Sequence, residues 1–481
     1  MKKYRLLILS LLALSCNDML EETPRDFVSR VNYYQTESDA IGAINGLYYS
    51  LSPDYFGSIH CYLLEELHGD YLNGQGGQAA ISNFSQVLNT SGITFASTNW
   101  TQAYAAINRA NAVLDNVKNI QMSESLKAQI LSEAMFIRSL AYFDLVRKFG
   151  PVPLRLNEVT DMNQIHAPRE SVDNVLDQIV ADLLVAENDL PEVGESTGRA
   201  SKWAAKMLLA HIYLTQEEWA KAAEKADEVI QSGVYQLVRV EKPDDFYRIF
   251  ASTFSPEDIM SVHHSQNIQT SVPTFIHRAD AFPYNAGAGF SAWAPAKNSW
   301  IGDSWSNADL RKRFNFYTKY VNAKGDSIAL PATSPILFKK FIDDPNGLSS
   351  YTLPIYRFAE ALLFYAEASC MAEGAPSALA LERLNMVLRR AYGYDPNAVS
   401  SIDFPPGMSQ EEFRDAVIQE RGYEFILERR RWFDLKRTGK LKEAFAQVGK
   451  EYIDERILWP IPVDEINNNN AIAVSDQNLG Y

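Results

Sequence analysis

The sequence predicts an all-α protein built on a tetratricopeptide-like helical-repeat scaffold, with long irregular loops and one loop-rich insertion. Apolar residues recur at steps of three and four through several long stretches, which is the spacing of amphipathic helices. A partial tetratricopeptide pattern falls within residues 203–235, and a weaker copy falls within residues 357–391. Residues 241–352 show little sustained periodicity and contain dispersed proline, glycine, serine and aromatic residues. We therefore expect an irregular insertion there.

The start of the chain has the pattern of a secretory signal peptide. A short cationic stretch precedes an apolar run over residues 6–14, which is too short to cross a bilayer permanently. The run ends at a small residue followed by Cys16, which is typical of a bacterial lipoprotein cleavage site, although Ala13 stands where Leu is usual. We expect a signal peptide over residues 1–15 and a lipid-anchored tether over residues 16–35. The alternative is an ordinary signal peptide that is cleaved near the same place, in which case Cys16 carries no lipid.

Charge and cysteine content exclude several classes of function. The formal net charge is −15 at pH 7, and no strongly basic cluster occurs. Binding to nucleic acid or to an anionic membrane surface requires a Lys/Arg footprint, so we exclude nucleic acid as a partner. Apart from Cys16, the cysteines are Cys61 and Cys370, each in an apolar context and neither at a metal-ligand spacing. We expect two buried free thiols, with a disulfide as the alternative.

The first elements of the scaffold follow from capping and periodicity. Thr36 and Asp39 supply a capping signal before an amphipathic run that ends near Leu51. Residues 69–98 are rich in Gly, Ser, Asn and Gln, which predicts a long surface loop. From Asn99 the pattern is helical. Two core-facing stripes predict two long helices: Leu126, Ile130, Ala134, Ile137, Ala141 and Leu145, then Val172, Leu176, Ile179, Leu183, Ala186 and Leu190.

Local breaks in the periodicity predict turns and further helices. Residues 150–154 must be extended, because a residue that precedes proline is disfavoured in the helical region. Helix is expected to resume from Leu353, and residues 409–412 form a capping box before another helix. The segment from Trp459 to Asn470 is expected to be extended and non-helical.

Residues 203–235 predict a helix pair that breaks near Thr215. The apolar and small positions of a tetratricopeptide repeat are occupied by Leu209, Ala210, Tyr213 and Ala222. In the weaker copy, Ala366 and Ala378 repeat the spacing of Ala210 and Ala222, where small residues let paired helices approach closely. An open solenoid needs about three stacked repeats or more, so we expect one helical domain over residues 36–481 instead.

Four groups of motifs follow one another along the chain. The first is Cys16-Asn17-Asp18 with Glu21-Glu22. The second combines Trp100, Tyr104, Ile107, Ala110-Asn111 and Leu114 with EAMFIRSLAYF from residue 133 and FGPVP from residue 149. The third pairs RASKWAA from residue 199 with YRFAEALLFYAEA from residue 356. The fourth comprises Glu420-Arg421, Glu424, Glu428, RWFDL from residue 431, LWPIP from residue 458 and QNLGY from residue 477.

Together these motifs resemble the SusD/RagB-like family of outer-membrane nutrient-binding lipoproteins, over essentially the whole chain. The resemblance implies a tetratricopeptide-like scaffold whose loops form a shallow binding face. It also implies capture of an oligosaccharide or polysaccharide at the cell surface, delivery to a SusC-like TonB-dependent outer-membrane transporter, and no chemistry. A minority of such proteins serve peptide uptake. Arg429 departs from the family, which commonly has Gly after Glu; we place Arg429 on a helix and expect a local packing change only.

Capture of a glycan requires flat aromatic side chains for the apolar faces of the sugar rings, with polar groups nearby for the hydroxyls. Two loop stretches offer both, over residues 70–73 and 282–293. We select as ligand-binding residues Tyr71, Asn73, Tyr284 and Trp293. The alternative for each is a packed or incidental loop residue. Six other tryptophans are assigned to the core: Trp100, Trp203, Trp219, Trp300, Trp305 and Trp432.

No residue pattern predicts catalysis, a metal site or a cofactor. Glu420, Glu424 and Glu428 stand at i, i+4 and i+8 of an expected helix, and a salt-bridged face is favoured over an acid/base pair. His263 and His264 are adjacent on an expected strand, so their side chains point to opposite sides. Three classes were weighed: a glycan-capture lipoprotein, an exported helical glycoside hydrolase, and a tetratricopeptide adaptor for a protein or peptide. The aromatic loops and the resemblance favour capture.

Overall fold

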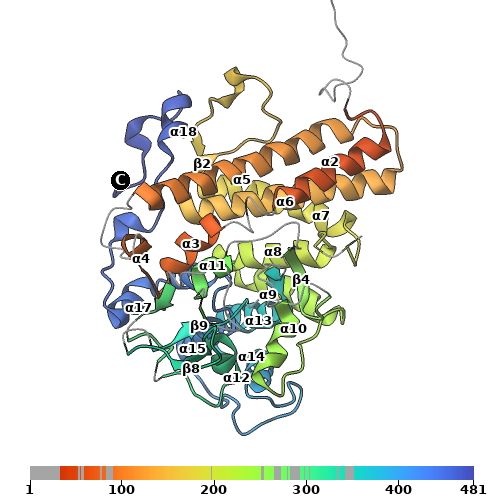
Figure 1. Cartoon of the computed structure of the whole chain (residues 1–481). Coiled ribbons are helices and arrows are strands. Elements are labelled where there is room, and N and C mark those ends of the chain that lie inside the picture. Colours follow the sequence, from red (N-terminus) through yellow and green to blue (C-terminus); the bar gives the residue numbers. More distant parts are fainter. Residues whose placement is uncertain are drawn as a thin grey trace, which may run out of the picture.

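The computed structural model is mainly helical, with short two-stranded antiparallel ribbons between the helices (Figure 1). The described residues are 33–51, 55, 59–75, 78–82, 90–194, 196, 198–250, 254–264, 272–278, 280–281, 293–296, 298–302, 304–332, 335–341 and 351–481. The predicted signal peptide, Cys16 and nearly all of the predicted tether lie outside them. None of the described helices is long and apolar enough to span a membrane.

The helix α2 (Glu37–Tyr49) begins at the predicted cap. The Asp39 backbone N–H donates to the Thr36 hydroxyl at 3.2 Å, and the Thr36 N–H donates back to the Asp39 carboxylate at 2.8 Å, which confirms the capping box. After α2 come α3 (Ile59–Leu67), β1 (Leu72–Gly74) and α4 (Ala79–Ser82). The predicted loop over residues 69–98 is therefore wrong in part, because it contains β1, α4 and the first residues of α5 (Thr90–Val117).

Three long helices form one layer of the molecule. These are α5, α6 (Glu124–Phe149) and α7 (Val172–Asp189), with α2 packed on α5 and α6 (Figure 1). The predicted stripes are largely buried in α6 and α7, which confirms both helices. Gly150 ends α6 with φ +71°, and a Cβ added there would lie 2.9 Å from a methyl group of Leu458. The chain then continues into β2 (Val152–Pro153), as predicted, and β2 pairs with β3 (Arg169–Glu170).

The tetratricopeptide-like part consists of two helix pairs. These are α8 (Lys202–Thr215) with α9 (Trp219–Gln231), and α13 (Phe358–Glu373) with α14 (Ala378–Ala391). The predicted break near Thr215 is confirmed. Because α9 packs directly on α13, the helical array continues across the inserted segment between them.

Two predictions about the second pair are wrong. Ala378 is exposed at the start of α14, and Ala380 is the buried small residue instead. Helix does not resume at Leu353, because residues 352–357 form the buried strand β10 (Thr352–Arg357), which pairs with β4 (Asp258–His263). Periodicity missed this strand because β10 is buried along its whole length and shows no alternation.

The inserted segment contains only short elements among its described residues, as predicted. In addition to β4 they are η3 (Pro243–Phe246), α10 (Tyr247–Phe250), α11 (Val272–Ile276), β5 (Trp293–Pro295), α12 (Leu310–Asn315), β6 (Phe316–Tyr317), β7 (Lys319–Val321), β8 (Ser327–Ala329) and β9 (Leu337–Phe338). β6 pairs with β9, and β7 pairs with β8.

The C-terminal part begins with α15 (Gln410–Glu424), whose predicted capping box at Ser409 and Glu412 is present. It continues through α16 (Arg431–Arg437), α17 (Leu441–Val448), η4 (Asp454–Arg456), α18 (Val463–Asn468) and η5 (Val474–Asp476). The prediction that residues 459–470 are non-helical is wrong, because α18 forms there directly after Pro462, with two acidic residues in its first turn.

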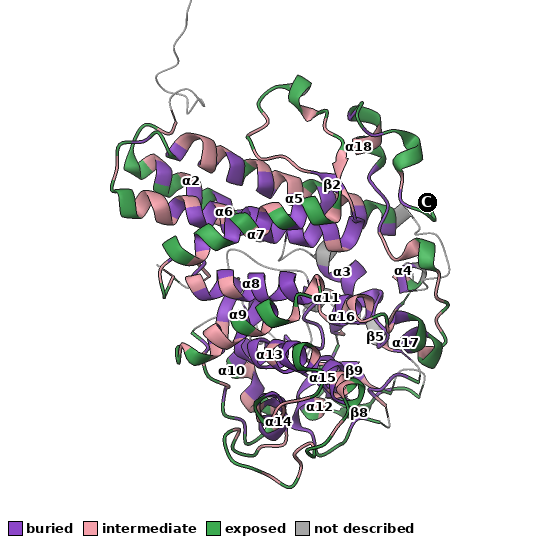
Figure 2. Ribbon diagram, turned by 180° about the vertical axis from the view of Figure 1, so that it is seen from behind, coloured by how far each residue is buried: buried purple, intermediate pink, exposed green. Residues whose placement is uncertain are grey.

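The hydrophobic core extends from α2 to the segment before α18. Figure 2 shows buried residues in the layer of α5, α6 and α7 and also in the helices around α8, α9 and α13. The tryptophans assigned to the core are buried, except Trp219, which is partly buried and packs against the core. Cys370 is a buried free thiol, as predicted. The side chain of Cys61 lies outside the described part of the chain.

Candidate ligand-binding ribbon

Strands β1 and β5 form a two-stranded antiparallel ribbon, in which Asn73 stands opposite Ala294 and Gly74 stands opposite Trp293. The Ala296 N–H extends the pairing by donating to the Tyr71 carbonyl at 2.7 Å. Asn73 is partly exposed between two buried neighbours, as alternation along a strand requires. The ribbon therefore brings together the backbones of two selected residues, Asn73 and Trp293, from stretches far apart in the sequence.

The prediction that Tyr71 stacks on a ligand is wrong, because its side chain is only 1% exposed. Its ring packs against Trp300, with ring centroids 5.5 Å apart, and against Phe338. Its hydroxyl donates to the Glu66 carboxylate and accepts the Leu427 backbone N–H at 3.0 Å. Tyr71 thus joins the start of β1 to the turn that follows α15, and its ring offers no free face.

Two of the selected residues stay predictions. Tyr284, with the rest of residues 282–292, lies outside the described residues. For Trp293 the structure describes the backbone, in β5, and not the side chain.

An ion pair between distant parts of the chain holds the base of the ribbon. The buried Asp70 carboxylate accepts two hydrogen bonds from the Arg431 guanidinium, at 2.9 and 2.6 Å. It also accepts the Trp300 indole N–H at 3.1 Å. Burial alone would lower the pKa of Arg431, but Asp70 raises it above its usual value. The residues that approach β1 are thereby tied both to α16 and to the aromatic core.

Buried Glu66 and partly buried Lys450 also fix the turn before β1. Glu66 accepts the Arg429 N–H at 2.5 Å, and burial raises the pKa of Glu66 to about 7. The Lys450 ammonium donates to the carbonyls of Leu67, Gly69 and Leu72, at 3.1, 2.6 and 3.0 Å. Burial lowers the pKa of Lys450 to about 8. Three carbonyls on one cation leave this turn little freedom, so the ribbon has a rigid base.

Sequence reasoning missed a partly exposed aromatic residue beside this base. The ring of Tyr423, on α15, stacks on Trp305 with centroids 4.7 Å apart and lies 5.4 Å from Trp300. Trp300 in turn contacts Tyr71, next to the ribbon. The helical periodicity around Tyr423 is polar and charged, so nothing local distinguished it from a solvated position.

The three glutamates do form ion pairs, but not on one helix face. Glu424 is the last residue of α15 and Glu420 lies one turn before it, whereas Glu428 lies in the turn after the helix, so the expected helix stops early. All three are buried. Their cationic partners, each within 3.0 Å, are Arg311 for Glu420 and Glu424, Arg357 and Arg390 for Glu424, and Arg357 and Lys340 for Glu428.

These pairings decide how the carboxylates can act. Burial alone would raise the pKa of Glu424, yet Arg390, Arg357 and Arg311 hold it well below its usual value. Arg357 and Lys340 likewise lower the pKa of Glu428 against the effect of burial. A general acid must hold a proton near neutral pH, and these two groups do not. The favoured interpretation is therefore confirmed as to the ion pairs, but the single helix face is wrong, because Glu428 lies beyond the end of α15.

Arg429 occupies a special backbone conformation instead of a helical one, so its expected place on a helix is wrong. Its φ is +64°, in the left-handed region that glycine adopts at the lowest cost. Its guanidinium forms two hydrogen bonds to the Glu65 carboxylate, each 2.7 Å long. This buried ion pair offsets the strain of a non-glycine residue at that position.

A cavity of about 420 Å³ offers a second place for a ligand, between α5 and α18. Trp100 and Tyr104 supply aromatic surface, and Thr101, Asn108, Arg155 and Glu465 are among its polar lining residues. A neighbouring cavity of about 340 Å³ shares Ser97, Thr101, Pro462 and Asp464 with it. Aromatic surface beside hydroxyl and amide groups suits a sugar. Among the described residues, no group of three His, Cys, Asp or Glu side chains is placed to hold a metal ion.

Comparison with known proteins gives consistent matches. The model of the SusD family matches residues 290–481, and a model described as "Starch-binding associating with outer membrane" matches residues 43–214. SusD-like protein P2 of Formosa agariphila is 29% identical over 521 residues, with 100% of both chains covered.

Solved structures match over nearly the whole chain. A SusD superfamily protein from Parabacteroides distasonis is 25% identical, with a TM-score of 0.79 over 92% of this chain and 99% of that chain. Surface glycan-binding protein A from Bacteroides fluxus is 22% identical, with a TM-score of 0.72 over 93% of this chain and 100% of that chain.

Proposed function

Since the chain belongs to the SusD/RagB-like family, we propose that it captures an oligosaccharide or polysaccharide at the outer membrane and delivers it to a SusC-like TonB-dependent transporter. The single observation that carries the binding site is the pairing of β1 with β5, which places Asn73 beside the strand that contains Trp293. An amide and a large aromatic residue are the two kinds of side chain that a sugar needs. The register puts them one residue apart across the ribbon and, by strand alternation, on its two faces.

A role without catalysis is supported by the state of the acidic residues. The glutamates of α15 and its following turn are buried in ion pairs, and the pKa values of Glu424 and Glu428 are lowered. Burial raises the pKa of Glu420, but its carboxylate is held by Arg311 at 2.7 Å and is not free to act on a sugar. A glycoside hydrolase needs two carboxyl groups that flank the sugar, one of them protonated. The described ribbon offers Asn73 instead, which can bind a hydroxyl but cannot transfer a proton at neutral pH.

Anchoring at the outer membrane is the second part of the proposal. Cys16 would carry the lipid, and the residues after it would tether the helical domain of residues 36–481 to the cell surface. The family description "associating with outer membrane" for residues 43–214 supports this location. Globomycin treatment of the expressing cell should leave the longer precursor uncleaved, and Cys16→Ala should release the protein from the membrane fraction.

The proposal is tested with the soluble chain that starts after Cys16, titrated calorimetrically against a panel of polysaccharides that begins with starch. We expect one glycan to bind, and Trp293→Ala to weaken that binding at least tenfold, about 1.4 kcal/mol. Tyr284→Ala and Asn73→Ala test the other two residues selected from the sequence. Tyr394→Ala, at an exposed aromatic residue of the loop after α14, is the matched control and should bind normally.

The remaining outcomes separate the alternatives. If Thr101→Trp abolishes binding while Trp293→Ala does not, the ligand occupies the α5–α18 cavity and the ribbon assignment fails. Binding of peptides but of no glycan would show that the ligand is a peptide. Glycan cleavage in the same mixtures, read by reducing-end release, would overturn the non-catalytic role. Co-purification of a TonB-dependent transporter from solubilised outer membranes tests the delivery step.

A further inference from the structure

A cavity of about 410 Å³ lies where α6, α7, α8 and α16 meet, and none of its lining residues belongs to β1 or β5. Most of its wall is apolar, contributed by Phe143, Val146, Val172, Leu176, Phe433 and Leu458. Val172 and Leu458 are partly exposed, which gives the cavity a solvent-facing rim. Its volume lies within the range of small-molecule sites, roughly 300–1,000 Å³.

Three cations also line this apolar cavity: Arg147, Lys436 and Arg437. Arg437 is fully paired, with Glu367 at 2.6 and 2.7 Å and with Asp434 at 2.9 Å. Lys436 differs, because its hydrogen bonds within the described part of the chain go to two backbone carbonyls, of Arg147 at 2.6 Å and Ile457 at 3.0 Å. Its ammonium also lies 5.2 Å from the centroid of the Trp432 ring. No carboxylate of the described residues lies within ion-pair distance of it. Burial lowers the pKa of Lys436 to about 7, with Arg147 nearby adding to that effect.

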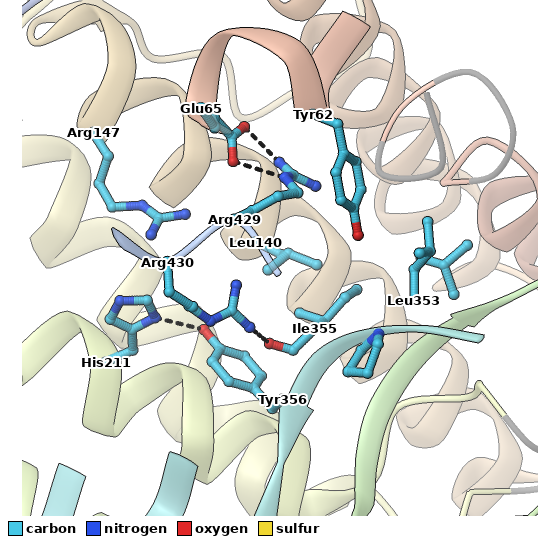
Figure 3. A pocket seen from close by; sticks show the side chains of 12 residues that line it. Tyr62, Glu65, Leu140, Arg147, His211, Leu353, Ile355, Tyr356, Arg429 and Arg430 are labelled. Carbon is cyan, nitrogen blue, oxygen red and sulfur yellow. Dashed lines mark hydrogen bonds and ion pairs between the residues drawn. The ribbon is translucent and has the colours of Figure 1, made fainter. Parts of the chain in front are cut away.

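Arg147 is also poorly paired. Its guanidinium lies between two rings, 4.3 Å from the Phe143 centroid and 4.1 Å from the Phe433 centroid. Its nearest carboxylate is Asp144, at 3.4 Å. Its Nη1 is buried and has no hydrogen-bond partner in the described part of the chain. Figure 3 shows this guanidinium near Arg429 and Arg430, where it lines a smaller cavity of about 30 Å³ as well.

The carboxylates near Arg147 form shorter contacts with other cations. Asp144 accepts Lys148 at 2.6 Å and the Tyr55 hydroxyl at 2.8 Å, both shorter contacts than the one from Arg147. Glu65 pairs with Lys148 and with Arg429, at 2.7 Å each. Asp144 and Glu65 are thus the carboxylates that pair with Lys148, Arg429 and Arg147, and no carboxylate of the described residues pairs with Lys436. The wall of the cavity carries surplus positive charge, which is costly in an apolar environment unless an anion neutralises it.

We propose that this cavity binds a small carboxylate with an apolar body, whose carboxylate contacts Arg147 and Lys436 and whose apolar part packs on Phe143, Leu176 and Phe433. The apolar wall disfavours a sugar, whose hydroxyls would lose their hydrogen bonds to water there. Lys436, which has no carboxylate partner among the described residues, and Arg147, which has one long contact to Asp144, favour an anion over a neutral hydrocarbon. The site is independent of the ribbon, so the two assignments can fail separately.

The test uses the soluble chain that starts after Cys16 and three probes: octanoate, 1-octanol and acetate. Titrations are made at about pH 6, below the Lys436 pKa of about 7. We expect octanoate to bind at one site per chain, and 1-octanol and acetate to bind at least tenfold more weakly. The two comparison probes remove the charge and the apolar body respectively. Equal affinity for octanoate and 1-octanol, or no binding of octanoate, would overturn the proposal.

Variants then locate the site. Lys436→Met should weaken octanoate binding at least tenfold, whereas Lys442→Met, at an exposed position in α17, should not change it. Val172→Phe keeps both cations and fills the rim, so it should also exclude octanoate; it covers the case in which Lys436→Met does not fold. Octanoate affinity unchanged in a folded Lys436→Met or Val172→Phe chain would show that the ligand sits elsewhere. Glycan affinity should be unaffected in both.

Discussion

Asp70 and Arg431 form a buried, doubly hydrogen-bonded ion pair, at 2.9 and 2.6 Å, between the segment that leads into β1 and the first residue of α16. Early and late parts of the chain therefore meet beneath the candidate ribbon. The same carboxylate accepts the Trp300 indole N–H, from the segment that follows β5. One side chain thus positions both strands of the ribbon relative to the helical scaffold.

Loss of this ion pair should be strongly destabilising. Asp70→Asn leaves the Arg431 guanidinium buried without its counter-ion, so we expect the free energy of unfolding to fall by about 3–5 kcal/mol. Urea denaturation followed by circular dichroism measures the change. Asp415→Asn is the control, because Asp415 pairs with Lys440 at the surface, where such pairs contribute about 0–1 kcal/mol. Similar losses in the two variants would contradict the role given to Asp70.

Because the backbone of Arg429 is left-handed, glycine should be more stable than alanine at this position, which is the reverse of the order inside a helix. With φ at +64°, a glycine there avoids a steric cost of about 1–2 kcal/mol. Both Arg429→Ala and Arg429→Gly lose the ion pair to Glu65, so their difference isolates the backbone. We expect the glycine variant to be the more stable of the two in urea denaturation. At Lys442, inside α17, the order should reverse, with alanine more stable by about 1 kcal/mol.

Glu66 should make stability fall as the pH rises. Burial raises its pKa from 4.5 to about 7 in the folded state, so between these values the folded chain holds a proton that the unfolded chain releases. Its contribution is therefore complete below about pH 4.5 and is lost as the pH rises through 7, by up to roughly 3 kcal/mol.

Glu66→Gln removes the titrating group and should flatten this part of the profile of unfolding free energy against pH. The measurement is a series of urea denaturations between pH 5 and about pH 8 on both chains. Glu443→Gln, at an exposed position, controls for the change in net charge. An unchanged slope in the Glu66→Gln chain would refute the assignment.

Because α8 is closely packed, a larger side chain should lower stability more at Ala210 than at Ala378. Ala210 is fully buried, so Ala210→Leu should overpack the core and lower the free energy of unfolding by about 1–3 kcal/mol. Ala378, its counterpart in the weaker repeat, is exposed, and Ala378→Leu should change stability by less than about 0.5 kcal/mol. Thermal denaturation of both variants checks the contrast; a large loss at Ala378 would mean that α14 packs differently.

Local signals in the sequence predicted much of the helical scaffold. The capping boxes at Thr36 and Ser409 and the break near Thr215 all occur where they were expected. These features depend on contacts within a few residues. The start of α5 at Thr90 was missed, because residues 90–98 are mostly small and polar and their composition is that of a loop.

The candidate site could be predicted only in part. The sequence pointed to Asn73 and Trp293 as loop residues of suitable chemistry, and their strands pair. Local sequence could not reveal that Tyr71 is a core residue, because two of the partners that bury it, Trp300 and Leu427, come from segments far along the chain. Tyr423 was missed for the same reason.

By itself, the sequence indicated the family by resemblance, the helical class and several helix boundaries, since periodicity, caps and breaking residues act over one or two turns. Only the tertiary structure decided which strands pair, which aromatic rings keep a free face, and which buried cations lack a carboxylate. Those properties depend on segments hundreds of residues apart, such as Asp70 and Arg431, and their energies arise only when folding removes water from around both partners.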